Sequence, residues 1–260
     1  MSKQLPYKVY LVCNARFHDT NFARLELLKL LAEHEDIHTQ VADSFRDTEA
    51  IKASDLLITY TCDLRPSAAE QVALGEFLNA GGHWFALHAT NAILEFVDGG
   101  KVDTPDVAPD FMHLLGSRFV AHPANQTIQV QVTDVAHPLT EGIADFEVED
   151  EEPYYCEALG EQTVLLEASY SEPSVGYVQA DYGTDRGSHP QMYLHPYAGE
   201  SSSENGGGQV LYLSLGHCAG KHDMKPMVDE IAVVRGSWNS PTYYELLRRG
   251  IRWGIGELAD

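Results

Sequence analysis

The chain has 260 residues, of which 44% are hydrophobic, and its 39 acidic against 17 basic residues give a formal net charge of −22 at pH 7. Nucleic acid and anionic membrane are therefore excluded as partners, because a face that binds phosphates needs clustered Lys and Arg. No run of about 18 apolar residues is present, so we expect no membrane-spanning helix, and the first residues show no signal-peptide pattern.

The first third of the chain alternates apolar runs with amphipathic segments. Four runs are typical of buried strands and lie at 7–13, 37–42, 55–61 and 83–88. Helical spacing of apolar residues predicts helices at 21–34 and 65–82, and Gly81 and Gly82 end the second one. This alternation predicts an α/β fold, with a mainly parallel sheet that carries helices on both faces.

The remainder of the chain is predicted to be rich in strands. We expect a turn-rich loop at 96–110 and strands at 127–134, 163–170, 174–180, 191–195 and 209–217. A polar loop is expected at 198–208, an irregular segment at 221–241, and a closing helix at 242–258. No linker divides the chain, so we predict a single domain over residues 1–260.

The four cysteines are far apart in the sequence, at Cys13, Cys62, Cys156 and Cys218. They form no C-x-x-C pair, which argues against a disulfide framework and against a zinc ribbon. We therefore expect reduced thiols and a cytoplasmic protein.

The stretch "GGHWFALHATNA" (81–92) has the form of a strand that turns sharply into a helix. Such an elbow often presents a serine or cysteine nucleophile, but here the exposed position is His88. A covalent acyl-enzyme mechanism at this elbow is therefore excluded. No glycine-rich phosphate-binding motif follows a predicted strand either.

Histidines follow three of the predicted strands. His18 comes after the first strand, His88 ends the fourth, and His217 ends the last core strand. A single histidine at a strand end is more often a structural residue. However, parallel strands end at the same edge of a sheet, where the sites of open α/β folds gather. We therefore expect these three side chains to share one site.

Other polar residues accompany these histidines. Asp19 follows the first histidine, and Asn91 lies three residues after the second. The acidic stretch "DEEPYY" (150–155) supplies Glu152 and Tyr155. Each has a plainer alternative, because Asn91 can simply cap a helix and an acidic stretch is commonly a solvated turn.

Imidazole suits two kinds of chemistry, namely proton transfer near neutral pH and metal ligation. Several histidines with one carboxylate suit zinc or another divalent ion that keeps an open position. No H-x-x-x-H pair is present, so any metal ligands must come from distant segments. Proton transfer by histidine alone needs no metal, and both alternatives stay open from the residues themselves.

Six segments in order resemble the ThuA-like family of trehalose-utilisation proteins. They are RFHD (16–19), FLNAGGHWFALHA (77–89), LLGSRFVAHP (114–123), HPLTEGIADFEVEDEEPYY (137–155), GQVLYLSLGH (208–217) and GIRWGIG (250–256). The resemblance spans residues 7–256. It implies a flavodoxin-like fold similar to that of class I glutamine amidotransferases, and a cytoplasmic role in the metabolism of trehalose or related carbohydrates.

The resemblance also carries over site residues one by one. His18, His88, His122, Glu152 and His217 match the family's pattern as site members. His195 keeps a further family histidine, although a histidine before proline, such as His122, commonly shapes a turn. The sequence departs from the family over 218–241, which is longer than usual. This insertion would reshape the mouth of the pocket and alter the substrate.

These observations lead to one main hypothesis. The protein is expected to be an enzyme, not a glutamine amidotransferase, that performs acid–base chemistry on a small carbohydrate substrate. The catalytic candidates are His18, His88 and Glu152; the metal candidates are His18, His88, His217 and Glu152, with zinc or manganese as the ion; the substrate-binding candidates are Asp19, Asn91, His122, Tyr155 and His195. The alternative is a non-catalytic protein that senses a small ligand in the same pocket. A homo-oligomer is a further expectation.

Overall fold

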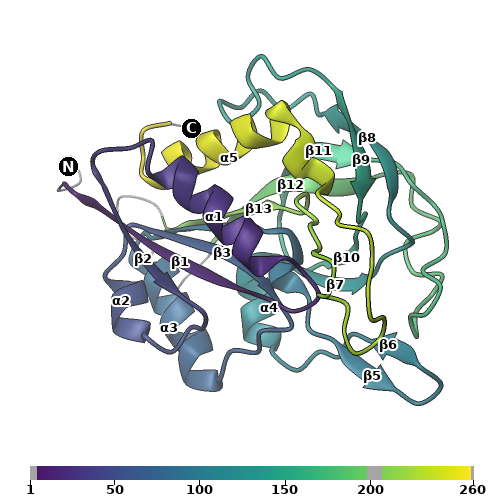
Figure 1. Ribbon diagram of the computed structural model, residues 1–260. Helices are drawn as coiled ribbons and strands as arrows, with labels where there is room; N and C mark the ends of the chain where they lie inside the picture. The colour runs from purple at the N-terminus through teal and green to yellow at the C-terminus, as the bar shows by residue number, and fades with distance from the viewer. Residues whose placement is uncertain (1–4, 198–206, 259–260) are drawn as a thin grey trace.

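The computed structural model of the protein describes residues 5–197 and 207–258, and a single large sheet forms its centre (Figure 1). The nine strands of this sheet, in spatial order, are β2 (Ile37–Ala42), β1 (Tyr7–Ala15), β3 (Leu56–Cys62), β4 (His83–Leu87), β13 (Gln209–Leu213), β12 (His189–Pro196), β11 (Thr163–Ala168), β8 (Gln126–Val132) and β9 (Phe146–Glu151). The first five run parallel to one another, and the last four join in antiparallel pairs.

The inner strands of the parallel half are apolar on both faces. Every residue of β3, the stretch LLITYTC, is buried. Such a continuous apolar run must be covered on both faces of the sheet, whereas an alternating strand can leave one face in water. The helices provide this cover, and the predicted α/β class is confirmed.

Helices cover both faces of the sheet (Figure 1). Helices α1 (Thr20–Leu31) and α5 (Pro241–Gly254) pack into one buried cluster, while α2 (Thr48–Lys52), α3 (Ala68–Asn79) and α4 (Pro109–Leu115) pack into the other. Helix α3 begins with a capping box, in which the Ser67 side chain accepts from the backbone of Glu70 and the Glu70 side chain accepts from the backbone of Ser67.

Smaller elements surround the carboxyl edge of the parallel strands. Strands β5 (Glu95–Val97) and β6 (Lys101–Asp103) form a hairpin, and β7 (Ser117–Ala121) pairs with β10 (Tyr155–Ala158). Two short 3₁₀ segments complete this region, η1 (His88–Asn91) directly after β4 and η2 (Gly236–Asn239) directly before α5.

Several predicted elements differ from the observed ones. The segment 174–180 is not a strand, because Gly176 has a φ of +103° and the amide of Ser174 donates to the carbonyl of Ala180, which closes a turn. The predicted loop at 96–110 contains the β5–β6 hairpin and the start of α4. Most of the polar loop expected at 198–208 lies outside the described residues.

The segment before α5 has little regular structure, as predicted for 221–241. It consists of turns, one isolated bridge between Ala219 and Val234, and η2. Within the part of the chain that the structure describes, no helix is long and apolar enough to cross a membrane.

Candidate functional site

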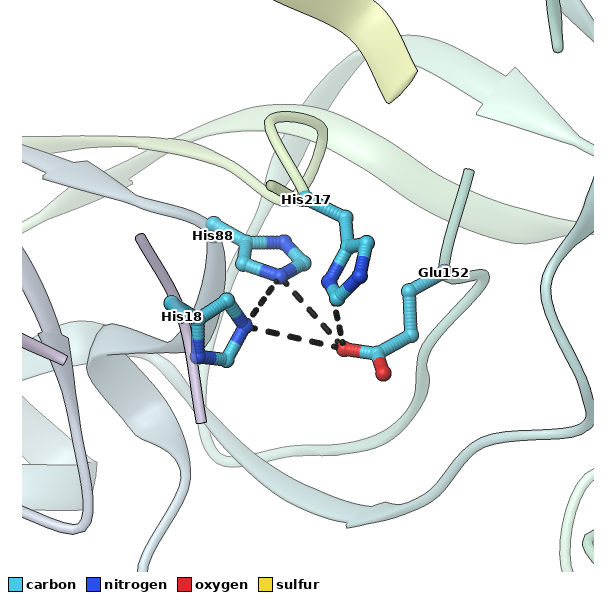
Figure 2. Close-up of side chains that lie close together, drawn as sticks. All are labelled: His18, His88, Glu152 and His217. Carbon is cyan, nitrogen blue, oxygen red and sulfur yellow. Dashed lines mark hydrogen bonds and ion pairs between the residues drawn. The ribbon is translucent and has the colours of Figure 1, made fainter. Parts of the chain in front are cut away.

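Three buried histidines and one glutamate meet at the carboxyl edge of the parallel strands (Figure 2). His18 follows β1 after a short turn, and His88 follows β4 directly. His217 lies in the loop after β13, and Glu152 follows β9. The structure therefore brings together residues from four segments that are far apart in the sequence, as expected from the direction of the parallel strands.

The nitrogen and oxygen atoms of this cluster face one another. Nε2 of His88 lies 3.0 Å from Nε2 of His18. Oε2 of Glu152 lies 3.8 Å from Nε2 of His18 and 3.5 Å from Nε2 of His88. It also lies 3.4 Å from Nδ1 of His217, and all four ligand atoms are within 4.8 Å of one another.

The spacing of these atoms fits a single metal ion. Four donors arranged tetrahedrally at about 2.0–2.1 Å from zinc lie about 3.3 Å from one another. The separations given above, 3.0 to 3.8 Å, lie on both sides of this value. In addition, Nδ1 of His217 is buried and makes no hydrogen bond to any described residue. A buried polar atom without a hydrogen bond is costly, and a metal ion would satisfy it.

Backbone carbonyls orient two of the three imidazoles. Nδ1 of His18 lies 2.7 Å from the carbonyl oxygen of Arg16, and Nδ1 of His88 lies 2.7 Å from that of Ser214. In each ring Nδ1 must carry the proton that it donates, so the lone pair of Nε2 faces the centre of the cluster. Such outer hydrogen bonds are typical of metal-bound histidine.

Glu152 links the cluster to two further side chains. The Tyr154 hydroxyl donates to Oε2 of Glu152 at 3.1 Å and lies 3.2 Å from Nε2 of His88, on which the tyrosine ring stacks. Nε2 of His122 lies 3.1 Å from the other carboxylate oxygen, Oε1. His122 is half-buried and donates from Nδ1 to the carbonyl of Pro123.

The electrostatics of the cluster favour an ionised Glu152. Burial alone would raise the pKa of this carboxyl, but the attraction of His122 and His217 outweighs burial and holds the pKa well below its usual range. Burial, reinforced by the nearby negative charge of Glu152, raises the pKa of Tyr154 well above its usual range. The tyrosine is therefore a hydrogen-bond donor and the glutamate an acceptor.

The two imidazoles in closest contact differ in their affinity for protons. For His18, burial opposes protonation, but hydrogen bonds to Cys62 and Glu152 overcome it and raise the pKa of the imidazole. Burial lowers the pKa of His88, and the neighbouring His18 lowers it further. In the absence of a metal, a proton in this cluster therefore resides on His18 rather than on His88.

A second buried carboxylate, Glu151, holds the loop that carries His217. Its Oε1 accepts from the amide of His217 at 3.0 Å, and its Oε2 accepts from the amides of Gly216 at 3.3 Å and Ser237 at 3.0 Å. The Ser237 hydroxyl also donates to Oε2. Glu151 thus fixes this loop and η2 to the end of β9. Sequence reasoning missed it, because nothing in the acidic stretch distinguishes Glu151 from Glu152.

The backbone around the cluster adopts unusual conformations. Among the described residues, the non-glycine positions with positive φ are Phe17 at 69°, Asp63 at 55°, His88 at 46° and Asp150 at 52°. All four lie in or beside the segments that supply the site. Positive φ is unfavourable for residues with a Cβ atom, and such residues gather at functional sites.

A cavity of about 380 Å³ opens above the cluster. Its polar end contains His18, His217, Glu152 and His122. The remaining lining is largely apolar and includes Phe17, the β5–β6 hairpin and the segment 219–234. It is completed by Cys62, Ala92, Leu94, Phe119, Asn125, Tyr154 and Tyr177. The inserted segment therefore forms one wall of the cavity.

Two predicted substrate-binding residues have structural partners near the site. Asp19 accepts from the amide of Phe22 at the start of α1 and pairs with Arg235 at 3.0 Å, so it joins α1 to the inserted segment. Asn91 is buried and donates to the Ser117 hydroxyl at 2.7 Å. Neither is among the residues that line the cavity.

Tyr155 and His195, also predicted to bind the substrate, are not among the residues that line the cavity. Tyr155 is buried, and its hydroxyl donates to the carbonyl of Glu172 at 3.0 Å; its neighbour Tyr154 faces the cavity instead. His195 pairs with Val210 near the start of β13, at the opposite edge of the sheet. Its position follows from the antiparallel direction of β12.

Comparisons with known proteins agree with this fold. The family model described as "Trehalose utilisation", ThuA, matches residues 8–232. A ThuA-like protein from Bacteroides uniformis has a TM-score of 0.65 at 20% identity, with 100% of this chain and 95% of that chain covered. One from Parabacteroides merdae has a TM-score of 0.65 at 14% identity, with 98% and 92% covered.

A β-galactosidase from Rahnella sp. R3 has a TM-score of 0.52 at 15% identity, and the similarity covers 82% of this chain but only 29% of that enzyme. These likenesses to solved structures concern the fold alone. No curated protein matches the sequence.

Proposed function

The chain belongs to the ThuA, or trehalose-utilisation, family, and we propose that it is an enzyme that uses a divalent metal ion for acid–base chemistry on a hydroxylated, sugar-like substrate. His18, His88, His217 and Glu152 would hold the ion. The observation that carries the proposal is the convergence of these four donors at the polar end of a cavity. One of these donors, Nδ1 of His217, is buried without a hydrogen bond, which is costly unless an ion occupies the centre.

The donor set suits zinc or manganese. Imidazole nitrogen is a good ligand for zinc, and manganese accepts nitrogen together with carboxylate oxygen. When bound, such an ion would supply a Lewis acid that polarises a substrate oxygen or makes a bound water more acidic.

The protein's own groups would move protons beside this centre. Glu152 presents Oε1 to Nε2 of His122 at 3.1 Å, and His122 lines the cavity. A proton taken from the substrate can therefore pass between this pair and the cavity. Tyr154 would donate a hydrogen bond to Glu152 and hold its orientation. His18 and His88 act in this proposal mainly as ligands that place the reacting oxygen.

The carbohydrate substrate and the cytoplasm are parts of the same proposal. The description of the family model as trehalose utilisation supports a sugar. The four cysteines are free thiols, which suits a reducing compartment. Assembly into a homo-oligomer also remains a proposal.

Metal analysis tests the centre directly. Protein purified without chelator should contain about one equivalent of zinc or manganese, measured by mass spectrometry of the metal. His217→Ala should lose the ion, whereas His38→Ala, which removes an exposed histidine on β2, should keep it. A protein that binds neither ion with measurable affinity would overturn the proposed centre.

Turnover tests the assignment of His122. Because His122 is outside the four-donor set, His122→Ala should retain the metal and lose most activity on a sugar substrate. A wild-type protein that binds metal and sugar but converts no sugar would favour the alternative of a ligand-sensing protein.

A further inference from the structure

The cavity is divided into two chemically different parts. At its polar end lie the histidines and Glu152, which can bind hydroxyl or carbonyl oxygen. The rest of the lining includes Phe96 and Val102 of the β5–β6 hairpin and Met224, Met227 and Ile231 of the segment 219–234. These five side chains offer no hydrogen-bonding partner to a sugar hydroxyl. A simple disaccharide would therefore lose hydration there without compensation.

The same two segments expose large apolar side chains. Phe96 is 44% exposed and Met227 is 45% exposed, although both line the cavity. Val97, Val228 and Val233 on these segments are also exposed. Of the thirteen large hydrophobic residues exposed in the described part of the chain, five therefore lie on two short segments at the cavity. Apolar surface concentrated beside a site indicates a ligand with an apolar part.

Polar contacts anchor each of the two segments that line the apolar part of the cavity. Arg65 donates to the carbonyl of Leu94 at 2.6 Å and pairs with Glu95 at 3.1 Å, which fixes the start of the hairpin. On the other side, Arg235 pairs with Asp19 at 3.0 Å and donates to the carbonyl of Val234, which fixes the end of the segment 219–234.

The side chains of this part suit an aromatic group in particular. The ring of Phe17 meets that of Phe96 edge-on, with centroids 5.8 Å apart. Met224 and Met227 add two flexible thioethers, which make favourable contacts with aromatic rings and adapt to their shape. Aromatic rings and thioethers around one space are a suitable environment for a further aromatic ring.

We infer that the substrate carries an aromatic group beside its hydroxylated part, with the hydroxyls at the His/Glu end and the aromatic group between Phe96 and Met227. This inference rests on the proposed function for the hydroxylated part only. The substrate class is thus an aryl glycoside or a similar aromatic polyol, rather than a disaccharide with two sugar rings.

Calorimetric titration of the metal-loaded protein tests this inference with phenyl α-D-glucopyranoside, methyl α-D-glucopyranoside, trehalose and benzyl alcohol as probes. Burial of a phenyl ring should make the phenyl glucoside bind roughly tenfold or more tightly than the methyl glucoside. Met227→Gln and Phe96→Gln should each reduce this preference at least threefold. Val233→Thr changes an exposed residue outside the lining and should leave the preference unchanged.

The outcomes separate the two proposals. Binding of trehalose or methyl glucoside as tightly as phenyl glucoside overturns the inference and leaves the proposed function standing. Failure of both aromatic probes to bind also overturns it, whatever the metal content. Binding of benzyl alcohol that Met227→Gln weakens, without binding of any glucoside, supports the aromatic subsite and contradicts the sugar part of the proposed function. If the protein prefers phenyl glucoside but neither Met227→Gln nor Phe96→Gln reduces this preference, the ring binds elsewhere. That result overturns its placement between Phe96 and Met227.

Discussion

The parallel and antiparallel halves of the sheet use histidine at strand ends in opposite ways. Strands β1, β4 and β13 run in one direction and lead to His18, His88 and His217 at one edge. Strand β12 runs the other way, and His195 near its end lies at the opposite edge, between the carbonyl oxygens of Glu161 and His113. The direction of the strand, and not the residue type, therefore decides which histidine reaches the site.

The antiparallel half nevertheless supplies the carboxylate. Strands alternate in direction from β13 through β12, β11 and β8 to β9, so β9 again runs the same way as β13. Its end therefore returns to the site edge and brings Glu151 and Glu152 with it. An antiparallel strand that runs in the same direction as the parallel strands ends at the site edge and can contribute a residue there. A strand that runs the other way ends at the opposite edge.

Substitution of His88 and of His195 tests whether strand direction decides which histidine binds the metal. His88→Ala removes a donor from the cluster and should weaken metal binding by more than the roughly 10- to 100-fold that the loss of an outer partner causes. His195→Ala should leave metal affinity unchanged and lower the free energy of unfolding by about 1 kcal/mol, because the imidazole no longer donates a hydrogen bond to a backbone carbonyl. Titration calorimetry and chemical denaturation measure the two effects. If the two variants bind metal with equal affinity, His88 is not a ligand and the proposed site edge is wrong.

Substitution of Glu151 tests how β9 contributes to metal binding and should have a smaller effect. Glu151→Gln replaces one acceptor oxygen by an NH₂ donor that faces backbone amides, and should weaken metal binding roughly 10- to 100-fold through displacement of His217. Glu149→Gln is the matched control, because Glu149 is exposed on the same strand. Retention of full affinity in Glu151→Gln would show that the loop holds His217 without this carboxylate.

The pH dependence of metal binding tests whether His18, at the carboxyl edge of the parallel strands, is a ligand. Metal binding requires an unprotonated Nε2 on His18, whose raised pKa lets protons compete above the ordinary histidine range near 6.5. The same raised pKa stabilises the metal-free fold at low pH, and this contribution is lost as the pH rises through it. The increase in melting temperature caused by zinc or manganese should therefore grow from pH 6 to pH 8. A constant increase would indicate that His18 is not a ligand.

The smallest effect concerns Asp19, beside the site but paired with Arg235. Asp19→Asn keeps a side chain that can cap α1 and removes only the ion pair, so it should lower the free energy of unfolding by at most about 1 kcal/mol. Affinity for a sugar ligand should be nearly unchanged. A large loss of sugar affinity with intact stability would restore the substrate-binding role predicted for this residue from the sequence.

The alternation of predicted strands and helices indicated the fold. The common direction of the parallel strands indicated which histidines would lie together. The ends of β1, β4 and β13 could be located because buried strands are continuous apolar runs that stop at polar residues. Tyr154 and Tyr155 could not be told apart, since neighbouring residues face opposite sides and the start of β10 was not visible. The false strand at 174–180 has the composition of a strand, but Gly176 turns the chain there.

The apolar part of the cavity could not be predicted from the sequence either. The segment 219–234 has no helical or strand period, so its methionines carry no signal of the direction in which they point. The end of this segment is held by the ion pair between Arg235 and Asp19, which are 216 positions apart and show no relation in the sequence.

The left-handed residues around the cluster have a consequence for laboratory evolution. A non-glycine residue with positive φ costs about 1–3 kcal/mol, and the affected positions include Phe17, His88 and Asp150. A library selected only for heat resistance should therefore be enriched in glycine at these positions, although glycine elsewhere is usually unfavourable. Glycine at position 88 would relieve strain and delete a metal-site donor in one step. Selection for thermal tolerance and selection for activity would thus pull this part of the chain in opposite directions.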